Sequence, residues 1–181
     1  PFRPSTPYAA SKAAAEMAGI QAWIGRGLEV VRVRPFNHTG PGQQRQFVVP
    51  ALAHQIIEAA ERGAATLKTG NLKVSRDLSD VRDVVRAYRL LLEGGQPGEV
   101  YNVCRGESVA IEDLAHRLLD LAGVDLALQI DPERVRPVDV PDMRGDATRL
   151  RDQTGWEPLV PLDRTLTDVL DYWRRPAPRP A

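Results

Sequence analysis

Two side chains near the start of the chain have the types and the spacing for acid–base chemistry. Tyr8 and Lys12 lie four residues apart in the sequence YAASK, which puts both on one face of a helix, one turn apart. A phenol has an ordinary pKa of about 10 and exchanges protons poorly at neutral pH. A neighbouring ammonium stabilises the phenolate and lowers that pKa, so the pair suits proton transfer. The alternative is a chance Tyr/Lys pair on the surface of an amphipathic helix.

Further polar candidates lie along the chain. Arg76 in VSRDLSD and Arg136 in RPVD carry guanidinium groups, which bind two phosphate oxygens at once and stay charged when partly buried. Asn37 and His38 open a polar, glycine-rich loop (NHTGPGQQRQ, 37–46) directly after a strand-like segment. Each has a simpler interpretation: the arginines as surface ion pairs in an arginine-rich sequence, and His38 as a loop histidine hydrogen-bonded to nearby backbone.

The elements that must position these residues follow from periodicity and from turn signals. Thr6 as N-cap and Pro7 at the first helical position begin a helix that carries the Tyr/Lys pair. A strand rich in β-branched residues follows that helix, which predicts a parallel α/β sheet. Helices are predicted over 8–24, 48–62, 80–93, 111–122, 147–153 and 162–174. Strands are predicted over 29–36, 66–69, 74–78 and 100–104.

Several features have a structural interpretation. Gly70-Asn71, between the second and third predicted strands, predicts a hairpin. Trp156 is predicted to anchor the core, and Cys104 to be an inert buried thiol. The segment 131–143 has three prolines and little periodicity, so we expect a long functional loop there. An exposed, charged helix face is predicted from Asp80, Arg82, Asp83 and Arg86.

Composition excludes several classes of protein. The 181 residues carry 24 basic and 24 acidic side chains with no dense basic block, so a nucleic-acid partner is not expected. A single cysteine, and the lack of any Cys/His cluster with zinc spacing, argue against a disulfide or a structural metal. No apolar run approaches the length that spans a bilayer, and no signal peptide is evident. We therefore expect a cytoplasmic protein without a membrane partner.

Five motifs resemble a known family in their order and spacing. They are YAASK, VRVRPFNHTGPGQ, RDLSDVRD, RPVDVPD and TGWEP. Together they resemble the C-terminal half of extended short-chain dehydrogenases/reductases, across residues 7–174. The likeness is greatest to the branch of GDP-mannose 4,6-dehydratases and GDP-4-keto-6-deoxymannose reductases. Within that branch FNHTGPGQ is more similar to the reductases.

The resemblance implies a role for each candidate residue. Tyr8 would be the catalytic acid/base, and Lys12 would tune it and bind the nicotinamide ribose of NAD or NADP. The other cofactor-binding residues implied are Pro35, Phe36 and His38. The substrate-binding residues implied are Asn37 near the pyrophosphate, Arg76 and Arg136 on the nucleotide diphosphate, and Asp139 on a ribose hydroxyl. Gln43 stands where the dehydratases carry an arginine, which puts a cofactor-binding role for Gln43 in doubt.

The resemblance also implies the architecture. We expect an α/β chain that forms the C-terminal part of a Rossmann-type parallel sheet plus a smaller α/β substrate-binding domain. Residues 1–45 and 79–104 would belong to the dinucleotide-binding domain, residues 46–78 and 105–175 to the substrate domain, and 176–181 to a disordered tail. The glycine-rich dinucleotide fingerprint and the family's upstream Ser/Thr do not occur among these residues. We therefore expect an N-terminal lobe of roughly 150 further residues in the parent enzyme.

The resemblance implies an NAD(P)-dependent nucleotide-sugar reductase that reduces the C4 ketone of a GDP-4-keto-6-deoxyhexose. A 4,6-dehydratase or epimerase of the same family is the first alternative. A nucleotide-sugar binding module without catalysis is the second, and a non-enzymatic scaffold with an inherited fold is the third. A homodimer through the helix that carries Tyr8 is also implied. No metal-binding residues are expected.

Overall fold

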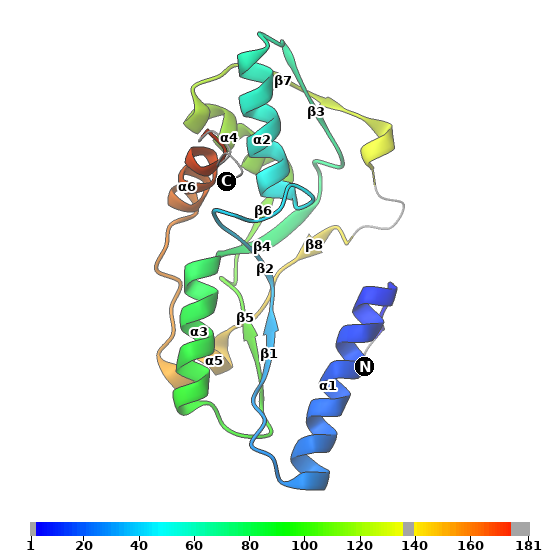
Figure 1. Ribbon diagram of the computed structural model, residues 1–181, viewed down its shortest axis with the longest axis vertical. Helices are drawn as coiled ribbons and strands as arrows, with labels where there is room; N and C mark the ends of the chain where they lie inside the picture. Colours follow the sequence, from blue (N-terminus) through cyan, green and yellow to red (C-terminus); the bar gives the residue numbers. More distant parts are fainter. Residues whose placement is uncertain (1–2, 136–139, 175–181) are drawn as a thin grey trace, which may run out of the picture.

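The computed structural model describes residues 3–135 and 140–174. The helices are α1 (Pro7–Arg26), α2 (Val48–Glu61), α3 (Val81–Gly94), α4 (Ile111–Ala122), α5 (Thr148–Thr154) and α6 (Leu162–Arg174), with a 3₁₀ turn η1 (Pro132–Arg134). The strands are β1 (Arg32–Pro35), β2 (Asn37–Thr39), β3 (Thr66–Thr69), β4 (Ser75–Asp80), β5 (Val100–Val103), β6 (Ser108–Ala110), β7 (Ala127–Ile130) and β8 (Asp142–Met143). Figure 1 shows an elongated molecule with α2, α4 and α6 at one end and α3, α5, β1 and β5 toward the other. The α/β fold class is as predicted, and β1 pairs in parallel with β5.

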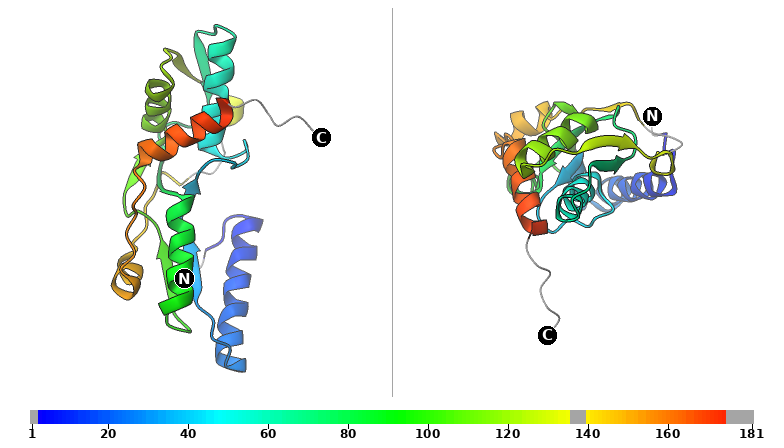
Figure 2. Two further views of the ribbon diagram at one scale, coloured as in Figure 1. Left: turned by 60° about the vertical axis from the view of Figure 1, so that its left-hand side comes forward. Right: turned by 90° about the horizontal axis from the view of Figure 1, so that it is seen from above.

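Helix α1 begins and ends at the residues that the sequence predicts. The hydroxyl of Thr6 accepts a hydrogen bond from the amide of Ala9 (3.1 Å), and Pro7 occupies the first turn. Gly27 ends the helix in the left-handed region, with φ of 67°. No residue of α1 is buried, and the helix stands beside β1 in both Figure 1 and Figure 2. The Tyr/Lys pair therefore sits on a well-capped helix outside the core.

The chain changes strand partners just after β1. Pro35 is the last residue of β1 in register with β5, opposite Val103, and the amide of Phe36 donates to the Val103 carbonyl (2.9 Å). The chain then pairs with β4, with Asn37 opposite Leu78. Residues 37–39 therefore form strand β2, and the prediction of a loop from 37 is wrong. These polar residues form a strand because they pair with β4, about forty residues later, and local composition does not encode such a long-range pairing.

The predicted hairpin at Gly70-Asn71 is also wrong. Strand β3 pairs in parallel with β7, whereas β4 pairs with β2, β6 and β8. Gly70 instead serves a close approach, because a β-carbon there would lie 2.7 Å from the carbonyl oxygen of Arg134. Leu67 and Thr69 are the buried residues of β3, and Leu67 packs into the first cluster of buried apolar residues.

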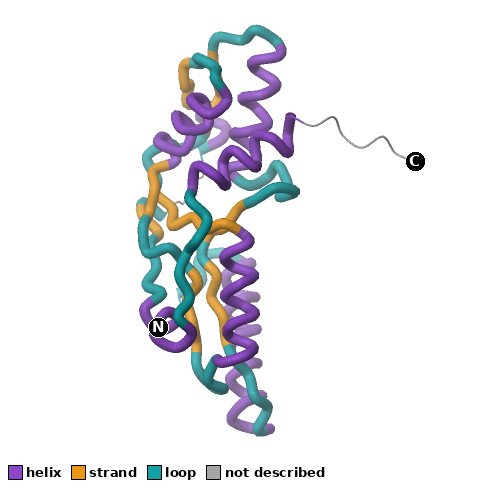
Figure 3. The backbone as a smooth tube through the Cα atoms, turned by 90° about the vertical axis from the view of Figure 1, so that its left-hand side faces the viewer, coloured by secondary structure: helices purple, strands orange, loops and turns teal. Residues whose placement is uncertain are grey.

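Two clusters of buried apolar side chains form the core. The first joins α2, α4 and α6 to β3 and β4, and the second joins α3, β5 and α5 to Trp156. The loop between α5 and α6 runs from the second cluster to the first (Figure 3). Ala147, Leu150 and Trp156 thus pack with elements assigned to the dinucleotide-binding domain, although 105–175 was assigned to the substrate domain as a whole. The division into two domains stays a prediction.

The charged residues at the start of α3 do not form the predicted exposed face. Asp80 and Asp83 are each only 1% exposed. The Asp80 carboxylate caps α3 by accepting from the amide of Arg82 (2.7 Å), and it also accepts from the hydroxyl of Thr165 on α6 (2.7 Å). Burial by itself would raise the pKa of Asp80, but hydrogen bonds from Arg82 and Thr165 outweigh it and lower the pKa overall. These carboxylates join α3 to the segment 159–165. The spacing of charges along a helix cannot predict such contacts with distant segments.

Candidate active site

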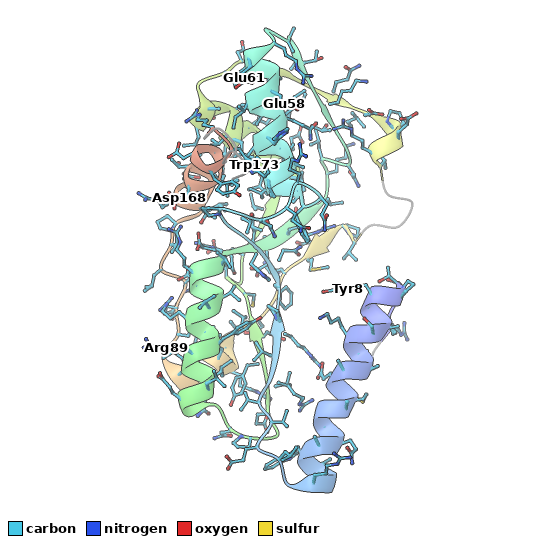
Figure 4. All side chains as sticks on the ribbon, viewed as in Figure 1. Tyr8, Glu58, Glu61, Arg89, Asp168 and Trp173 are labelled. Carbon is cyan, nitrogen blue, oxygen red and sulfur yellow. The ribbon has the colours of Figure 1, made fainter. Side chains whose placement is uncertain are left out.

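Tyr8 and Lys12 face the same side of α1, as their spacing predicts. The Lys12 ammonium nitrogen lies 5.5 Å from the centroid of the Tyr8 ring. The Tyr8 side chain is 72% exposed and points from the first turn of α1 toward the strands (Figure 4). The phenol is thus open to a ligand and has a cation within one helical turn, which is the arrangement that acid–base chemistry needs.

Pro35, Phe36, Asn37 and His38 lie together where the chain passes from β1 to β2. Pro35 and Asn37 are exposed, whereas Phe36 is partly buried. A β-carbon at position 145 would lie 2.8 Å from the Phe36 ring, so the glycine there lets the ring pack against the backbone. This segment forms the carboxyl end of a parallel strand, where ligands of open α/β sheets bind.

His38 has a defined tautomer when it is neutral. Its Nδ1 atom lies 3.0 Å from the carbonyl oxygen of Phe36. A carbonyl only accepts, so Nδ1 carries the proton and Nε2 keeps an acceptor lone pair. The predicted alternative, a histidine hydrogen-bonded to nearby backbone, therefore holds for Nδ1. The lone pair of Nε2 can still accept a hydrogen bond from a ligand.

The side chain of Gln43 makes hydrogen bonds to Thr39 and to the backbone of His38. Its amide nitrogen donates to the carbonyl of His38 (3.0 Å), and its amide oxygen accepts from the hydroxyl of Thr39 (2.7 Å). Both ends of the Gln43 side chain are thus engaged inside the loop. An arginine at this position would present donors only, so it could not accept the Thr39 hydrogen bond.

Arg76 contacts main-chain carbonyls of β4 and of the segment that leads into β8. Its guanidinium donates to the carbonyls of Ser75 and Val140, each at 2.7 Å. Arg136 and Asp139 fall within 136–139, outside the described residues. The contact with Val140 ties Arg76 to the first described residue after that range.

A fully buried carboxylate lies directly after Arg76. Asp77 accepts hydrogen bonds from the main-chain amides of Arg105 (2.8 Å), Gly106 (2.9 Å) and Gly145 (3.3 Å). Cys104, beside it, is fully buried; that burial, followed by the negative charge of Asp77, raises the pKa of its thiol to about 11. Cys104 is therefore an inert thiol, as predicted.

Glu16 is a residue of this region that sequence reasoning missed. Its carboxylate accepts two hydrogen bonds from Arg34 (2.8 and 2.6 Å) and one from Arg32 (3.1 Å). It thereby ties the helix of the Tyr/Lys pair to β1, whose end leads into Phe36 and His38. The signal was present, because Glu16 follows Lys12 at the same spacing at which Lys12 follows Tyr8.

The family can be established by comparison with known proteins. The profile of the family described as GDP-mannose 4,6 dehydratase matches residues 1–169. The chain belongs to this GDP-mannose 4,6-dehydratase family. A relative in the family is the GDP-6-deoxy-D-mannose reductase of Pseudomonas aeruginosa, 43% identical over 171 residues. The alignment covers 94% of this chain and 56% of the reductase, so the chain spans about half the length of its relative.

Solved structures place the chain on the same fold. RMD from Pseudomonas aeruginosa, complexed with NADPH, is 42% identical and superposes with a TM-score of 0.88, over 94% of this chain and 57% of that one. The UDP-glucose 4-epimerase of Thermotoga maritima, solved with UDP-glucose, is 29% identical with a TM-score of 0.86, over 95% of this chain and 54% of the epimerase. The chain thus shares its fold with about half of each of these two longer proteins. Within the described ranges, no helix is long and apolar enough to cross a membrane.

Proposed function

We propose that these residues form the C-terminal half of an NAD(P)-dependent nucleotide-sugar reductase that reduces the C4 ketone of a GDP-4-keto-6-deoxyhexose. The observation that carries the proposal is the Tyr8/Lys12 pair, exposed on one face at the start of a capped helix. The identity of 43% to a GDP-6-deoxy-D-mannose reductase supports the choice of reaction within the family.

Tyr8 would act as the general acid. NADH or NADPH, when bound, would supply the hydride that the carbonyl carbon needs. The Tyr8 hydroxyl donates its proton to the carbonyl oxygen, so no alkoxide charge accumulates, and the phenolate that remains is stabilised by the Lys12 ammonium. Lys12 thus lowers the cost of giving up the proton.

The residues present fit one end of a dinucleotide. Lys12 can donate to ribose hydroxyls, the His38 Nε2 lone pair can accept from a hydroxyl or an amide, and Pro35 and Phe36 offer an apolar surface. The glycine-rich loop that binds a pyrophosphate does not occur among the 181 residues. The chain would therefore hold the nicotinamide end, and NAD and NADP both remain candidates.

Arg76, Arg136, Asp139 and Asn37 would bind the nucleotide sugar. Guanidinium groups match phosphate oxygens in charge and in geometry, and the carboxylate of Asp139 would accept from a ribose hydroxyl. The hydrogen bond from Arg76 to the Val140 carbonyl supports a role for β4 and Val140 in one site.

Product analysis on the complete polypeptide that carries this segment tests the proposal. The reductase assignment predicts that a GDP-4-keto-6-deoxyhexose and NADPH or NADH give a 4-hydroxyl sugar, seen by NMR, with stoichiometric loss of reduced cofactor. A 4,6-dehydratase is the second candidate, favoured by the family profile; it would instead convert GDP-mannose to the ketone with no net use of cofactor. Binding without turnover of either sugar would indicate the non-catalytic module.

A further inference from the structure

Glu16 occupies the third position of one stripe on α1. Tyr8, Lys12 and Glu16 follow one another at intervals of four residues, so successive members lie one turn apart. On the helix alone, a carboxylate four residues after a lysine can pair with that lysine. Such a pair would draw the Lys12 ammonium away from the phenol one turn in the other direction.

The structure gives the Glu16 carboxylate other partners. Arg34 donates from Nε to Oε2 (2.8 Å) and from Nη2 to Oε1 (2.6 Å), which is a bidentate pair. Arg32 adds a third hydrogen bond to Oε1 (3.1 Å) and is itself fixed by donating to the Gly98 carbonyl (2.7 Å). The Glu16 side chain is only 12% exposed, and these contacts, that of Arg34 first, lower its pKa.

We propose that Arg34, on β1, is a positioning residue for catalysis. It holds the Glu16 carboxylate by hydrogen bonds, so that the Lys12 ammonium stays close to Tyr8 and does not pair with Glu16. This inference rests on the proposed function of the Tyr8/Lys12 pair. Arg34 acts through Glu16 and Lys12 and needs no contact with the substrate.

Other ionisable groups near this stripe do not offer the same control. The ionisable side chains of α1 and β1 are Tyr8, Lys12, Glu16, Arg26, Arg32 and Arg34. Arg26 lies in the last turn of α1, far along the helix from Tyr8. The segment around Gly98, which packs against Trp23 of α1, is followed by Glu99, whose carboxylate pairs with Arg149. Glu16 is thus the one carboxylate of α1 and β1, and Arg34 is its main partner.

The pH dependence of the complete polypeptide tests the proposal. In the reductive direction kcat falls at alkaline pH as the Tyr8 phenol loses its proton. In Arg34→Gln, Glu16 is released toward Lys12, the ammonium then stabilises the phenolate less, and the alkaline limb should move up by about 0.5 to 1 pH unit. At neutral pH kcat should fall about three- to tenfold because the acid is weaker, while KM for the nucleotide sugar stays unchanged.

A second substitution separates this role from support of the fold. Glu16→Gln/Arg34→Gln has no carboxylate to release, so its alkaline limb should return to the wild-type position. Arg34→Lys keeps a cationic partner and should also stay near wild type. A limb that does not move in Arg34→Gln, or a double variant that is no better than Arg34→Gln, would overturn the proposal.

Lys12 provides the remaining control. In a Lys12→Met background, Arg34→Gln should cause no further shift of the alkaline limb, because the proposed effect passes through Lys12. A shift of the same size in that background would also overturn the inference. Failure of this inference can be told apart from failure of the proposed function. If Tyr8→Phe keeps its kcat, the proposed function is wrong. If Tyr8→Phe is inactive but the alkaline limb of Arg34→Gln does not shift, only the role of Arg34 is wrong.

Discussion

The indole nitrogen of Trp156 donates a hydrogen bond to the main-chain carbonyl of Asp83 at 2.9 Å, inside the second core cluster. This contact joins the segment between α5 and α6 to the first turn of α3. The Asp83 carboxylate completes the junction by accepting from the amides of Leu159 (3.1 Å) and Val160 (3.0 Å). The motifs RDLSDVRD and TGWEP are therefore two sides of one structural contact.

Replacing Trp156 tests this junction. Trp156 is fully buried, so Trp156→Ala should lower the free energy of unfolding by about 3 to 5 kcal/mol through the cavity it leaves. Denaturant unfolding of the complete polypeptide measures the loss. Trp173→Ala on α6, which is only partly buried, is the matched control and should cost less. Equal losses would contradict a special role for Trp156.

Asp80 should make folding sensitive to acid. Its pKa is lowered in the folded state, so its contribution to stability is complete above the unfolded-state pKa of about 4 and is lost as pH falls through the folded value. Asp80→Asn should reduce stability at neutral pH and flatten the acid limb of the stability profile. Urea midpoints measured from neutral pH down to about pH 3 check both effects. Asp163, exposed on α6, supplies the control Asp163→Asn, which should leave the profile unchanged.

Arg76 and Arg136 should affect the substrate more than the cofactor. Loss of one charged, partly desolvated contact to a diphosphate costs about 2 to 3 kcal/mol, so Arg76→Ala or Arg136→Ala should raise KM for the nucleotide sugar about 30- to 150-fold. Arg89→Ala, on an exposed arginine of α3, is the control. Steady-state kinetics with each ligand varied in turn would show the split. Equal weakening of substrate and cofactor, or of neither, would contradict the assignment.

The apolar face between α3 and β1 should make the isolated 181-residue polypeptide associate. A hollow of about 320 Å³ there is lined by Val31, Val33, Tyr88, Leu91 and Leu92, and Leu92 is 87% exposed. Parallel strands are normally covered on both faces, so we expect this surface to recruit further protein. Light scattering should detect aggregates or oligomers, which Leu92→Glu reduces. A monodisperse, cooperatively unfolding monomer would mean that these residues fold as a complete domain.

The sequence predicts best where local signals and long-range packing agree. Residues 111–122 and 162–174 form α4 and α6 at the predicted boundaries, because the apolar stripe of each helix meets the first core cluster. The Thr6 cap and the shared face of Tyr8 and Lys12 also follow from spacing alone.

Long-range pairing explains the errors. Gly70-Asn71 has the composition of a hairpin turn, yet β3 finds its partner about sixty residues later in β7. Asp80 and Asp83 have the spacing of a solvated helix face, but Thr165, Leu159 and Val160 supply donors from distant segments and bury them. Glu16 was missed for the same reason, since its partners lie on β1.

The rate of ketone reduction by Tyr8→Phe tests the central claim most directly. The complete polypeptide would be given a GDP-4-keto-6-deoxyhexose with saturating reduced cofactor, and cofactor oxidation would be followed. Tyr172→Phe, the same chemical change at a half-exposed tyrosine on α6, is the control. We predict that Tyr8→Phe lowers kcat by about 10² to 10⁴-fold with unchanged folding, while Tyr172→Phe keeps the wild-type rate. A Tyr8→Phe protein that retains most of its kcat would contradict the account.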